Sequence, residues 1–340
     1  MHTRCNMRCR VIFITIVTSL LLDALSSYAV SRPNREGTSF IQVRASGTNV
    51  MAHNSSSAHD VPLHELRDGQ RMPVLGLGTA GGSYEAVRMA LRLGYRMFDT
   101  AQLYGTEEAV GQAIRDSGVP RSDIFVTTKI MDSEHGYWPA FHAGSESNNK
   151  LGLGYIDLLL IHSPDTGKIV ETYDALLKLQ KDGIVRSVGV SNFGISHLKA
   201  LEKYCRPMPV LNQFELHPLI FSERQELIEY CEAKQIMVQA YASIFLGNTD
   251  LIALANETAK PHHKTAAQAL LRWALDQRYA VIPKSVHQER LAENIDVFDF
   301  HLSNDEIGGL SKLSSEKTRQ IYGERNPNTT PVDVGHFQRL

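Results

Sequence analysis

Short runs of hydrophobic residues alternate along this chain with longer stretches in which hydrophobic positions recur every three to four residues. The short runs are typical of buried β-strands, and the recurring positions indicate amphipathic helices. The strand-like runs are Val74–Gly78, Met97–Asp99, Ile124–Lys129, Ile156–His162, Ser187–Ser191, Val210–Gln213, Met237–Tyr241 and Ala280–Pro283. Helical patterns between them include Ile169–Lys181, Ile195–Tyr204, Arg224–Lys234 and Ala266–Asp276.

Eight strand–helix alternations predict a (β/α)8 TIM barrel, a fold that needs roughly 250 residues. A doubly wound open sheet is the alternative, but a GxGxxG turn after the first strand is missing. In front of the barrel, Val61–Leu66 and Met72–Gly76 flank an Asp-Gly turn, which predicts a β-hairpin. We expect this hairpin to cap the bottom of the barrel.

The N-terminal residues have a different character. Three arginines precede the apolar run Val11–Leu22, and Ser27–Ala29 supplies small residues for cleavage after Ala29. This order predicts a signal peptide over residues 1–29, which is too short for a comfortable membrane span. We therefore expect no membrane span in the mature protein. A retained anchor, or a shorter product that starts at Met51, is the alternative.

Residues 30–60 are rich in Ser, Asn and Arg, and Glu36 is their only acid before Asp60. This composition predicts a disordered linker or a transit-like second targeting segment. The folded body is then expected over residues 61–326, with a C-terminal tail over 327–340. The expected localisation is entry into the secretory pathway, for secretion or organelle delivery, or the cytoplasm if translation starts at Met51.

The overall composition narrows the choice of partners. The 340-residue chain is 43% apolar, enough for a large core, and its net charge is −2. Because no basic stripe is present, nucleic acid is not an expected partner. No metal site is predicted. Without heptad repeats or an exposed apolar stripe we expect a monomer that binds a small molecule.

Residues 94–111, together with the strand-like run that ends at Lys129, contain a candidate catalytic group. Asp99 ends a short apolar run there, Tyr104 follows one loop later, and Lys129 ends the next strand-like run. If neighbouring parallel strands bring Asp99 and Lys129 to one face, the ammonium would lower the pKa of the Tyr104 phenol from about 10. Singly, such residues are more often caps, solvated cations or packing groups. Together they predict that Tyr104 is a general acid.

Polar residues follow nearly every strand-like run. In a TIM barrel the chemistry lies in the loops after the strands, so these side chains should line one bowl. The strand ends carry Gly78 and, after it, the polar residues Thr79, Asp99, Lys129, His162, Ser191, Asn192, Gln213, Tyr241, Lys284 and Ser285.

The sequence resembles the aldo-keto reductase family over about residues 61–326. The motifs that carry the resemblance are GYRMFDTAQLYGTEEAVG (94–111), LLIHSP (159–164), GIVRSVGVSNF (183–193), NQFELHP (212–218) and VIPKSVHQERLAEN (281–294). The resemblance implies a nicotinamide cofactor bound in extended form without a Rossmann domain. It also implies a catalytic tetrad of Asp99, Tyr104, Lys129 and His162, in which His162 and Tyr104 contact the substrate carbonyl.

The resemblance also assigns residues to NADPH. Four would hold the nicotinamide, three at its carboxamide and one stacked on the ring: Ser191, Asn192, Gln213 and Tyr241. Five would hold the 2′-phosphate and the adenine: Lys284, Ser285, Arg290, Glu293 and Asn294. Three more near the first strands complete the set: Gly78, Thr79 and Asp99. Physically, a lysine and an arginine at the start of a helix suit a dianion.

The sequence departs from the family pattern at the substrate pocket. Family members often have aromatic residues at the positions of Ala80, Met131 and Ser163. The loop after Tyr241 also lacks the usual Ser-Pro-Leu-Gly motif. The short connections resemble compact members that reduce small diketones, glyoxals and sugar-like carbonyls. We therefore expect NADPH-dependent reduction of small aldehydes or ketones. A non-catalytic nucleotide sensor and a structural protein on the same fold are the alternatives.

Overall fold

The computed structural model describes residues 61–313 and 332–333. Within them, one parallel sheet contains eight strands in the order of the chain. The strands are β3 (Leu77–Gly78), β4 (Met97–Asp99), β5 (Phe125–Ile130), β6 (Ile156–Ile161), β7 (Val185–Ser191), β8 (Leu211–Glu215), β9 (Met237–Tyr241) and β10 (Ala280–Val281). A parallel bridge between Leu75 and Val281, with a 3.0 Å bond from Gly76 N to Val281 O, joins the first strand to the last. The sheet is therefore a closed barrel.

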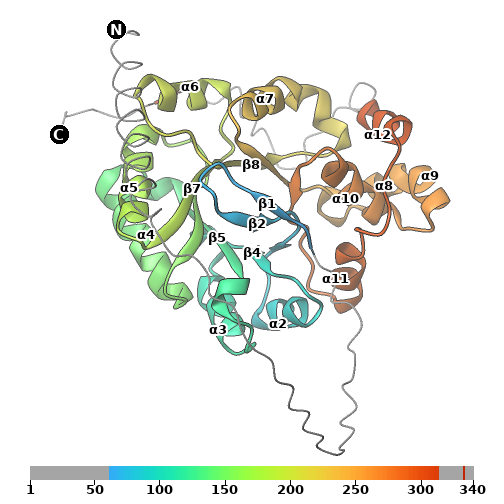
Figure 1. Cartoon of the computed structure of the whole chain (residues 1–340), viewed down its shortest axis with the longest axis horizontal. Helices are drawn as coiled ribbons and strands as arrows, with labels where there is room; N and C mark the ends of the chain where they lie inside the picture. Colours follow the sequence, from blue (N-terminus) through green and yellow to red (C-terminus); the bar gives the residue numbers. More distant parts are fainter. Residues whose placement is uncertain (1–60, 314–331, 334–340) are drawn as a thin grey trace, which may run out of the picture. The chain divides into compact units, whose positions relative to one another are not determined.

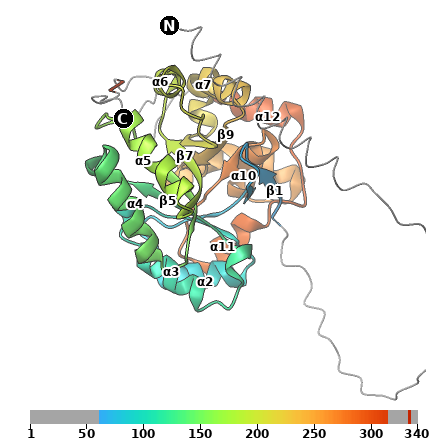
Figure 2. The same cartoon turned by 60° about the vertical axis from the view of Figure 1, so that its left-hand side comes forward.

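Helices surround the strands in both views of the ribbon (Figure 1, Figure 2). The longer ones are α2 (Tyr84–Arg92), α3 (Glu107–Arg115), α4 (Tyr137–Leu151), α5 (Ile169–Lys181), α6 (Ile195–Lys203), α7 (Phe221–Ala233), α10 (Ala266–Asp276), α11 (Gln288–Ile295) and α12 (Asn304–Ser311). Two single-turn helices, α8 (Thr249–Ile252) and α9 (Asn256–Ala259), lie between β9 and α10. The 3-10 turns are η1 (Gln102–Tyr104), η2 (Arg121–Asp123), η3 (Asp132–Glu134), η4 (Pro218–Ile220), η5 (Phe245–Gly247), η6 (Ala253–Ala255) and η7 (Lys260–His262).

A two-stranded antiparallel hairpin precedes the barrel and lies across the middle of the ring of helices in Figure 1. It consists of β1 (Leu63–Glu65) and β2 (Arg71–Pro73), and its turn contains Gly69 at a φ of 85°. The Asp68 carboxylate accepts a 2.8 Å bond from Ser187 Oγ of β7. This bond ties the hairpin turn to the barrel.

The alternation of side chains along the strands divides the buried residues into two hydrophobic clusters. Phe98, Val126 and Leu159 belong to the large cluster that includes the helices. Their neighbours Met97, Phe125, Leu158 and Leu160 belong to a smaller cluster with Leu66 and Met72 of the hairpin. Because successive side chains of a strand point to opposite faces, the smaller cluster fills the barrel interior. The hairpin residues close its lower end.

One close contact in the outer layer requires a glycine. A Cβ on Gly111 of α3 would lie 1.8 Å from the carbonyl oxygen of Leu151, at the end of α4. Only a residue without a side chain allows these helices to approach so closely.

The barrel and the hairpin confirm the fold predicted from the sequence, and the closure between β3 and β10 excludes the open-sheet alternative. The expected signal peptide, the linker and all of the C-terminal tail except residues 332–333 lie outside the described residues. In the described part, no helix is long and apolar enough to cross a membrane. The same residues contain no group of metal-ligating side chains that could hold an ion.

Candidate active site

The strand ends bring three of the predicted catalytic residues to one end of the barrel. Asp99 is the last residue of β4, Lys129 lies one residue before the end of β5, and His162 directly follows β6. Tyr104 ends the 3-10 turn η1, which follows β4. Asp99 and Lys129 are almost completely buried, at 1% and 0% exposure.

Lys129 forms a buried ion pair with Asp99. Its Nζ also donates to the carbonyl oxygen of Thr100 at 3.0 Å, and the second Asp99 oxygen accepts from Gln213 Nε2 at 2.7 Å. Complete burial disfavours the charged form of Lys129, but Asp99 and Tyr104 more than offset this penalty. The pKa of Lys129 is therefore raised above its usual value. Lys129 is an ammonium at neutral pH.

Tyr104 lies between the lysine and the histidine. Lys129 Nζ is 5.0 Å from the centroid of the Tyr104 ring. The rings of Tyr104 and His162 meet edge to face, with centroids 5.7 Å apart and an interplanar angle of 83°. The structure thus brings the phenol, the ammonium, the carboxylate and the imidazole into one group at the carboxyl ends of the strands.

The four residues assigned to the nicotinamide lie beside this group and contact one another. Ser191 Oγ donates to the Gln213 carbonyl at 2.9 Å, and Asn192 Nδ2 donates to the His162 carbonyl at 3.0 Å. The Tyr241 hydroxyl donates to Asn192 Oδ1 at 2.9 Å. Asn192 adopts a φ of 59°, in the left-handed region that asparagine tolerates better than most residues. These contacts hold Asn192 and Tyr241 in fixed orientations next to His162.

Gln213 differs from its expected position. It was expected at the end of a strand, but β8 continues to Glu215 and places Gln213 at its centre. The Gln213 amide nitrogen donates to Asp99 and, at 2.7 Å, to Gln239 Oε1 of β9. In this structure Gln213 therefore supports the Asp99 carboxylate, because its amide nitrogen donates to Asp99 and to Gln239 within the protein.

Gly78 and Thr79 lie where the first barrel strand passes the last. A Cβ on Gly78 would be 2.8 Å from the Ile282 carbonyl oxygen. Thr79 is 1% exposed, and its hydroxyl donates to the Asp99 carbonyl oxygen at 3.0 Å. Thr79 therefore fixes the backbone of Asp99, and Gly78 permits the close approach of β10.

The five residues assigned to the far end of the cofactor follow β10 and lie on or just before α11. Lys284 and Arg290 are exposed, whereas Ser285 is buried and its Oγ accepts from the His287 amide at 3.1 Å. Glu293 accepts a hydrogen bond from the Thr265 hydroxyl. Asn294 is 1% exposed, and its Nδ2 has no hydrogen-bond partner among the described residues. Lys284, Arg290 and the Asn294 amide can therefore donate hydrogen bonds to acceptor atoms of a ligand.

Comparison with known proteins identifies the family of this chain. Residues 75–315 match the Aldo/keto reductase family. The chain belongs to this family. It is 41% identical over 260 residues to a 9,11-endoperoxide prostaglandin H2 reductase of Trypanosoma cruzi, covering 74% of this chain and 91% of that one. It is 38% identical over 258 residues to a glyoxal reductase of Bacillus subtilis, covering 74% and 93%.

A solved structure shows the same fold. The aldo-keto reductase of Bombyx mori, determined in complex with NADP, superposes with a TM-score of 0.71 at 33% identity and covers 80% of this chain and 98% of that one. Membership of the Aldo/keto reductase family confirms that the protein is an oxidoreductase, as the motifs indicated.

In this aldo/keto reductase, Met131 and Ser163 stand at two positions where family members often have aromatic residues, and both make polar contacts. Ser163 is buried, and its hydroxyl donates to the Asp132 carboxylate at 2.8 Å. The Met131 amide donates to Gln102 Oε1 at 2.9 Å, two residues before Tyr104 in the chain. The loops after β4, β5 and β6 are therefore joined by hydrogen bonds, and no large ring fills these positions.

Three residues of the catalytic end were not predicted from the sequence. Gln239 accepts from Gln213, the Thr100 carbonyl accepts from Lys129, and the Thr106 hydroxyl bonds to Thr100 Oγ1 at 2.8 Å. Gln239 did have a signal, because it is a polar residue within the otherwise apolar strand Met237–Tyr241. The threonines had none, since Thr is ordinary at strand ends and helix caps.

Proposed function

We propose that this protein reduces small aldehydes and ketones to alcohols with NADPH, and that Tyr104 is the proton donor. The observation that carries the proposal is the convergence of Tyr104, Lys129, Asp99 and His162 at the carboxyl ends of the barrel strands. In a TIM barrel this is the end where catalysis occurs. The glyoxal reductase among the relatives supports a small carbonyl as the substrate class.

The residues present fit the cofactor. The buried Asn294 side chain of α11 has a donor without a partner among the described residues, which suits an acceptor on an adenine ring. Lys284 and Arg290 form no ion pair with any residue of the described part, so both can face a 2′-phosphate. Asn192 and Tyr241 lie on the His162 side, where the nicotinamide would bind. When bound, NADPH supplies the hydride.

The protein's own residues protonate and orient the carbonyl oxygen of the substrate. As this oxygen gains negative charge, Tyr104 donates its phenolic proton to it. The Lys129 ammonium stabilises the phenolate that results, and Asp99 holds the ammonium in place through the ion pair. The edge-to-face contact with Tyr104 puts the His162 ring beside the phenol, where it donates a hydrogen bond that orients the carbonyl.

An NADPH-consumption assay tests this function. The full-length protein would be offered glyoxal, methylglyoxal and a small diketone with either NADPH or NADH, and loss of reduced cofactor would be followed. We expect turnover of at least one carbonyl with NADPH. Tight NADPH binding with no consumption across the panel would instead favour the sensor or the structural protein.

We expect Arg290→Ala to weaken NADPH binding at least about tenfold and to leave NADH binding nearly unchanged. The reason is that a charge-assisted contact contributes roughly 1.5–3 kcal/mol, and only NADPH carries the 2′-phosphate. Titration of both cofactors measures the effect. Arg92→Ala, which removes an exposed arginine of α2, is the matched control. An equal loss for both cofactors would contradict the assignment of Arg290 to the phosphate.

The proposed localisation is entry into the secretory pathway after cleavage of residues 1–29. The support is the order of basic, apolar and small residues before Ala29. N-terminal sequencing of the protein from its native source should give a chain that starts at Val30. An intact Met1, or a chain that starts at Met51, would contradict this proposal.

A further inference from the structure

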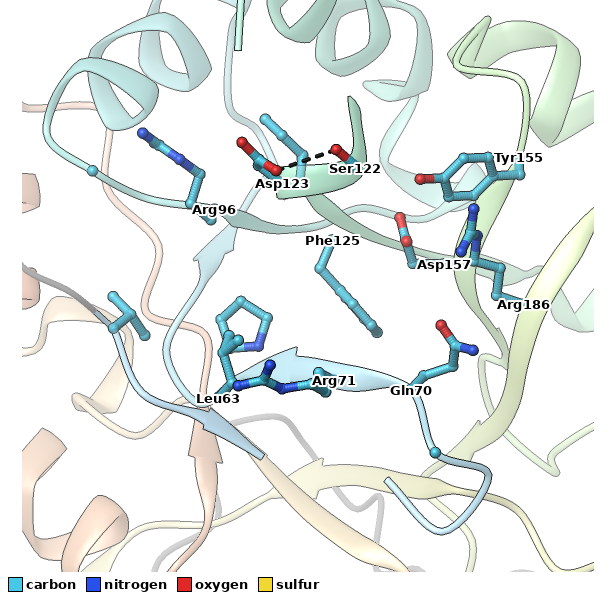
Figure 3. Close-up of a pocket in the computed structure, with 15 residues that line it drawn as sticks. Leu63, Gln70, Arg71, Arg96, Ser122, Asp123, Phe125, Tyr155, Asp157 and Arg186 are labelled. Atoms are coloured by element: carbon cyan, nitrogen blue, oxygen red, sulfur yellow. Dashed lines mark hydrogen bonds between the residues drawn. The ribbon is translucent and has the colours of Figure 1, made fainter. Parts of the chain in front are cut away.

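A cavity of about 750 Å³ lies under the hairpin, where the barrel strands begin. Figure 3 shows it between β2, with Gln70 and Arg71, and the segments that lead into β5 and β6. The candidate active site lies where the strands end. The cavity is therefore separate from the catalytic group, and the proposed function leaves it without a role.

Tyr155 lines one wall of the cavity and is stacked between two arginines, of which Arg186 also lines the cavity. The guanidinium carbons of Arg121 and Arg186 lie 3.9 and 3.8 Å from the centroid of the Tyr155 ring. The two terminal nitrogens of Arg121 are engaged, with bonds of 2.6 Å to Asp157 Oδ2 and to the Ile124 carbonyl oxygen, whereas its buried Nε has no partner among the described residues. Because Arg121 balances the buried Asp157 carboxylate, the negative charge of this wall is already compensated.

Arg186 differs from Arg121 in what its guanidinium contacts. It is exposed, and no hydrogen bond or ion pair engages its side chain in the described part of the chain. Stacking on Tyr155 fixes the plane of this guanidinium, so its forked donors are oriented in advance. Figure 3 shows Arg186 beside Asp157 and Tyr155, with the Gln70 side chain pointing toward them from the hairpin.

Two more arginines and an apolar floor complete the cavity. Arg71 is exposed and likewise forms no ion pair among the described residues, and Arg96 donates only to backbone carbonyl oxygens. Among the described residues that line the cavity, Asp123 is the one carboxylate besides Asp157. Phe125, 5% exposed, lies across the middle of the cavity, and Leu63 flanks it with 48% of its surface exposed.

We propose that this cavity binds a small organic anion whose carboxylate or phosphate group is held by Arg186 and whose apolar part covers Phe125 and Leu63. A guanidinium fork binds carboxylate and phosphate in the same bidentate geometry, so the two headgroups share one chemistry. The preceding segment of the chain is a poor occupant. Residues 30–59 carry three arginines and a single acid, so their charge does not complement the arginines of the cavity.

Calorimetric titration of the full-length protein, saturated with NADP⁺, tests the proposal with four probes. Phenyl phosphate and benzoate carry the two headgroups, inorganic phosphate lacks the apolar part, and benzyl alcohol lacks the charge. We expect phenyl phosphate or benzoate to bind at least tenfold more tightly than either inorganic phosphate or benzyl alcohol. Equal binding of benzyl alcohol, or of inorganic phosphate, would overturn the proposed ligand class.

Substitutions test whether the anionic probe binds in this cavity. Arg186→Ala should lower the affinity for the anionic probe at least tenfold, and Arg186→Lys, which keeps the charge but not the planar fork, should recover only part of it. Lys260→Ala, an exposed cation on η7, should leave the affinity unchanged. Thermal unfolding of each variant confirms folding. If the affinity survives Arg186→Ala in the folded protein, the probe binds elsewhere and the site is refuted.

Discussion

Tyr104→Phe is expected to lower turnover at least about a hundredfold while NADPH affinity stays nearly unchanged. General acid catalysis contributes about a hundred- to ten-thousandfold, and phenylalanine keeps the ring while it removes the proton. The ring packs edge to face on His162, so this substitution preserves the shape of the site. Single-turnover kinetics, in which hydride transfer is followed directly, together with an NADPH titration, measure the two effects separately.

His162→Ala is the comparison that separates proton donation from orientation. Loss of the imidazole should lower the rate and also change the order of preference among small carbonyls, because the hydrogen bond that aligns the carbonyl is lost. Tyr104→Phe should slow all of them by similar factors. Near-normal hydride transfer in Tyr104→Phe would mean that water or another group donates the proton, and the proposed role of Tyr104 would then be wrong.

Helix and strand positions were predictable where local signals and hydrophobic periodicity agreed. The predicted bounds of β4, β9, α5 and α10 match the structure. For α10 the reason is visible in the sequence: Thr265 and Gln268 form a capping box directly before the apolar face. Where a capping box and the hydrophobic periodicity indicate the same first residue, the start of the helix is well determined by the sequence.

Strand β8 shows where such prediction fails. The strand was expected over Val210–Gln213, yet it runs over Leu211–Glu215, and Glu215 is 1% exposed. Glu215 Oε1 is 3.1 Å from His217 Nε2, a contact that gives the buried carboxylate a polar partner. Periodicity alone cannot show that a polar residue has a partner, so the sequence suggested a strand that was too short.

The candidate catalytic group was predictable because three of its members lie at strand ends and Tyr104 lies in the loop after one of them, and a barrel must bring these positions together. The internal bonds of Gln213 were not, because its partners Asp99 and Gln239 are 114 and 26 residues away. The Arg121–Tyr155–Arg186 stack was missed for the same reason. Its members belong to different segments, and no local spacing relates them.

Lys129→Met is expected to damage both stability and turnover. Asp99 would remain buried with Gln213 and without its cation, and removal of one partner of a buried ion pair costs about 3–5 kcal/mol. The proton donor would also lose its charged neighbour, so turnover should fall roughly as far as in Tyr104→Phe. The raised pKa of Lys129 means that the pair still stabilises the folded state at neutral pH and up to the lysine's ordinary value of 10.5, and that this contribution is lost as pH rises further.

The double variant Lys129→Met/Asp99→Asn separates these two effects. It removes both charges, so the folded protein contains no unpaired buried carboxylate, and the free energy of unfolding measured with urea at neutral pH should recover most of the loss. Turnover should stay low, because Tyr104 still lacks the ammonium that stabilises its phenolate. Tyr104→Phe/Lys129→Met should likewise be little worse than either single variant, since the two residues act as a unit. If turnover recovered together with stability in the charge-free variant, Lys129 would serve only to hold Asp99, and Tyr104 would donate its proton without help from the lysine.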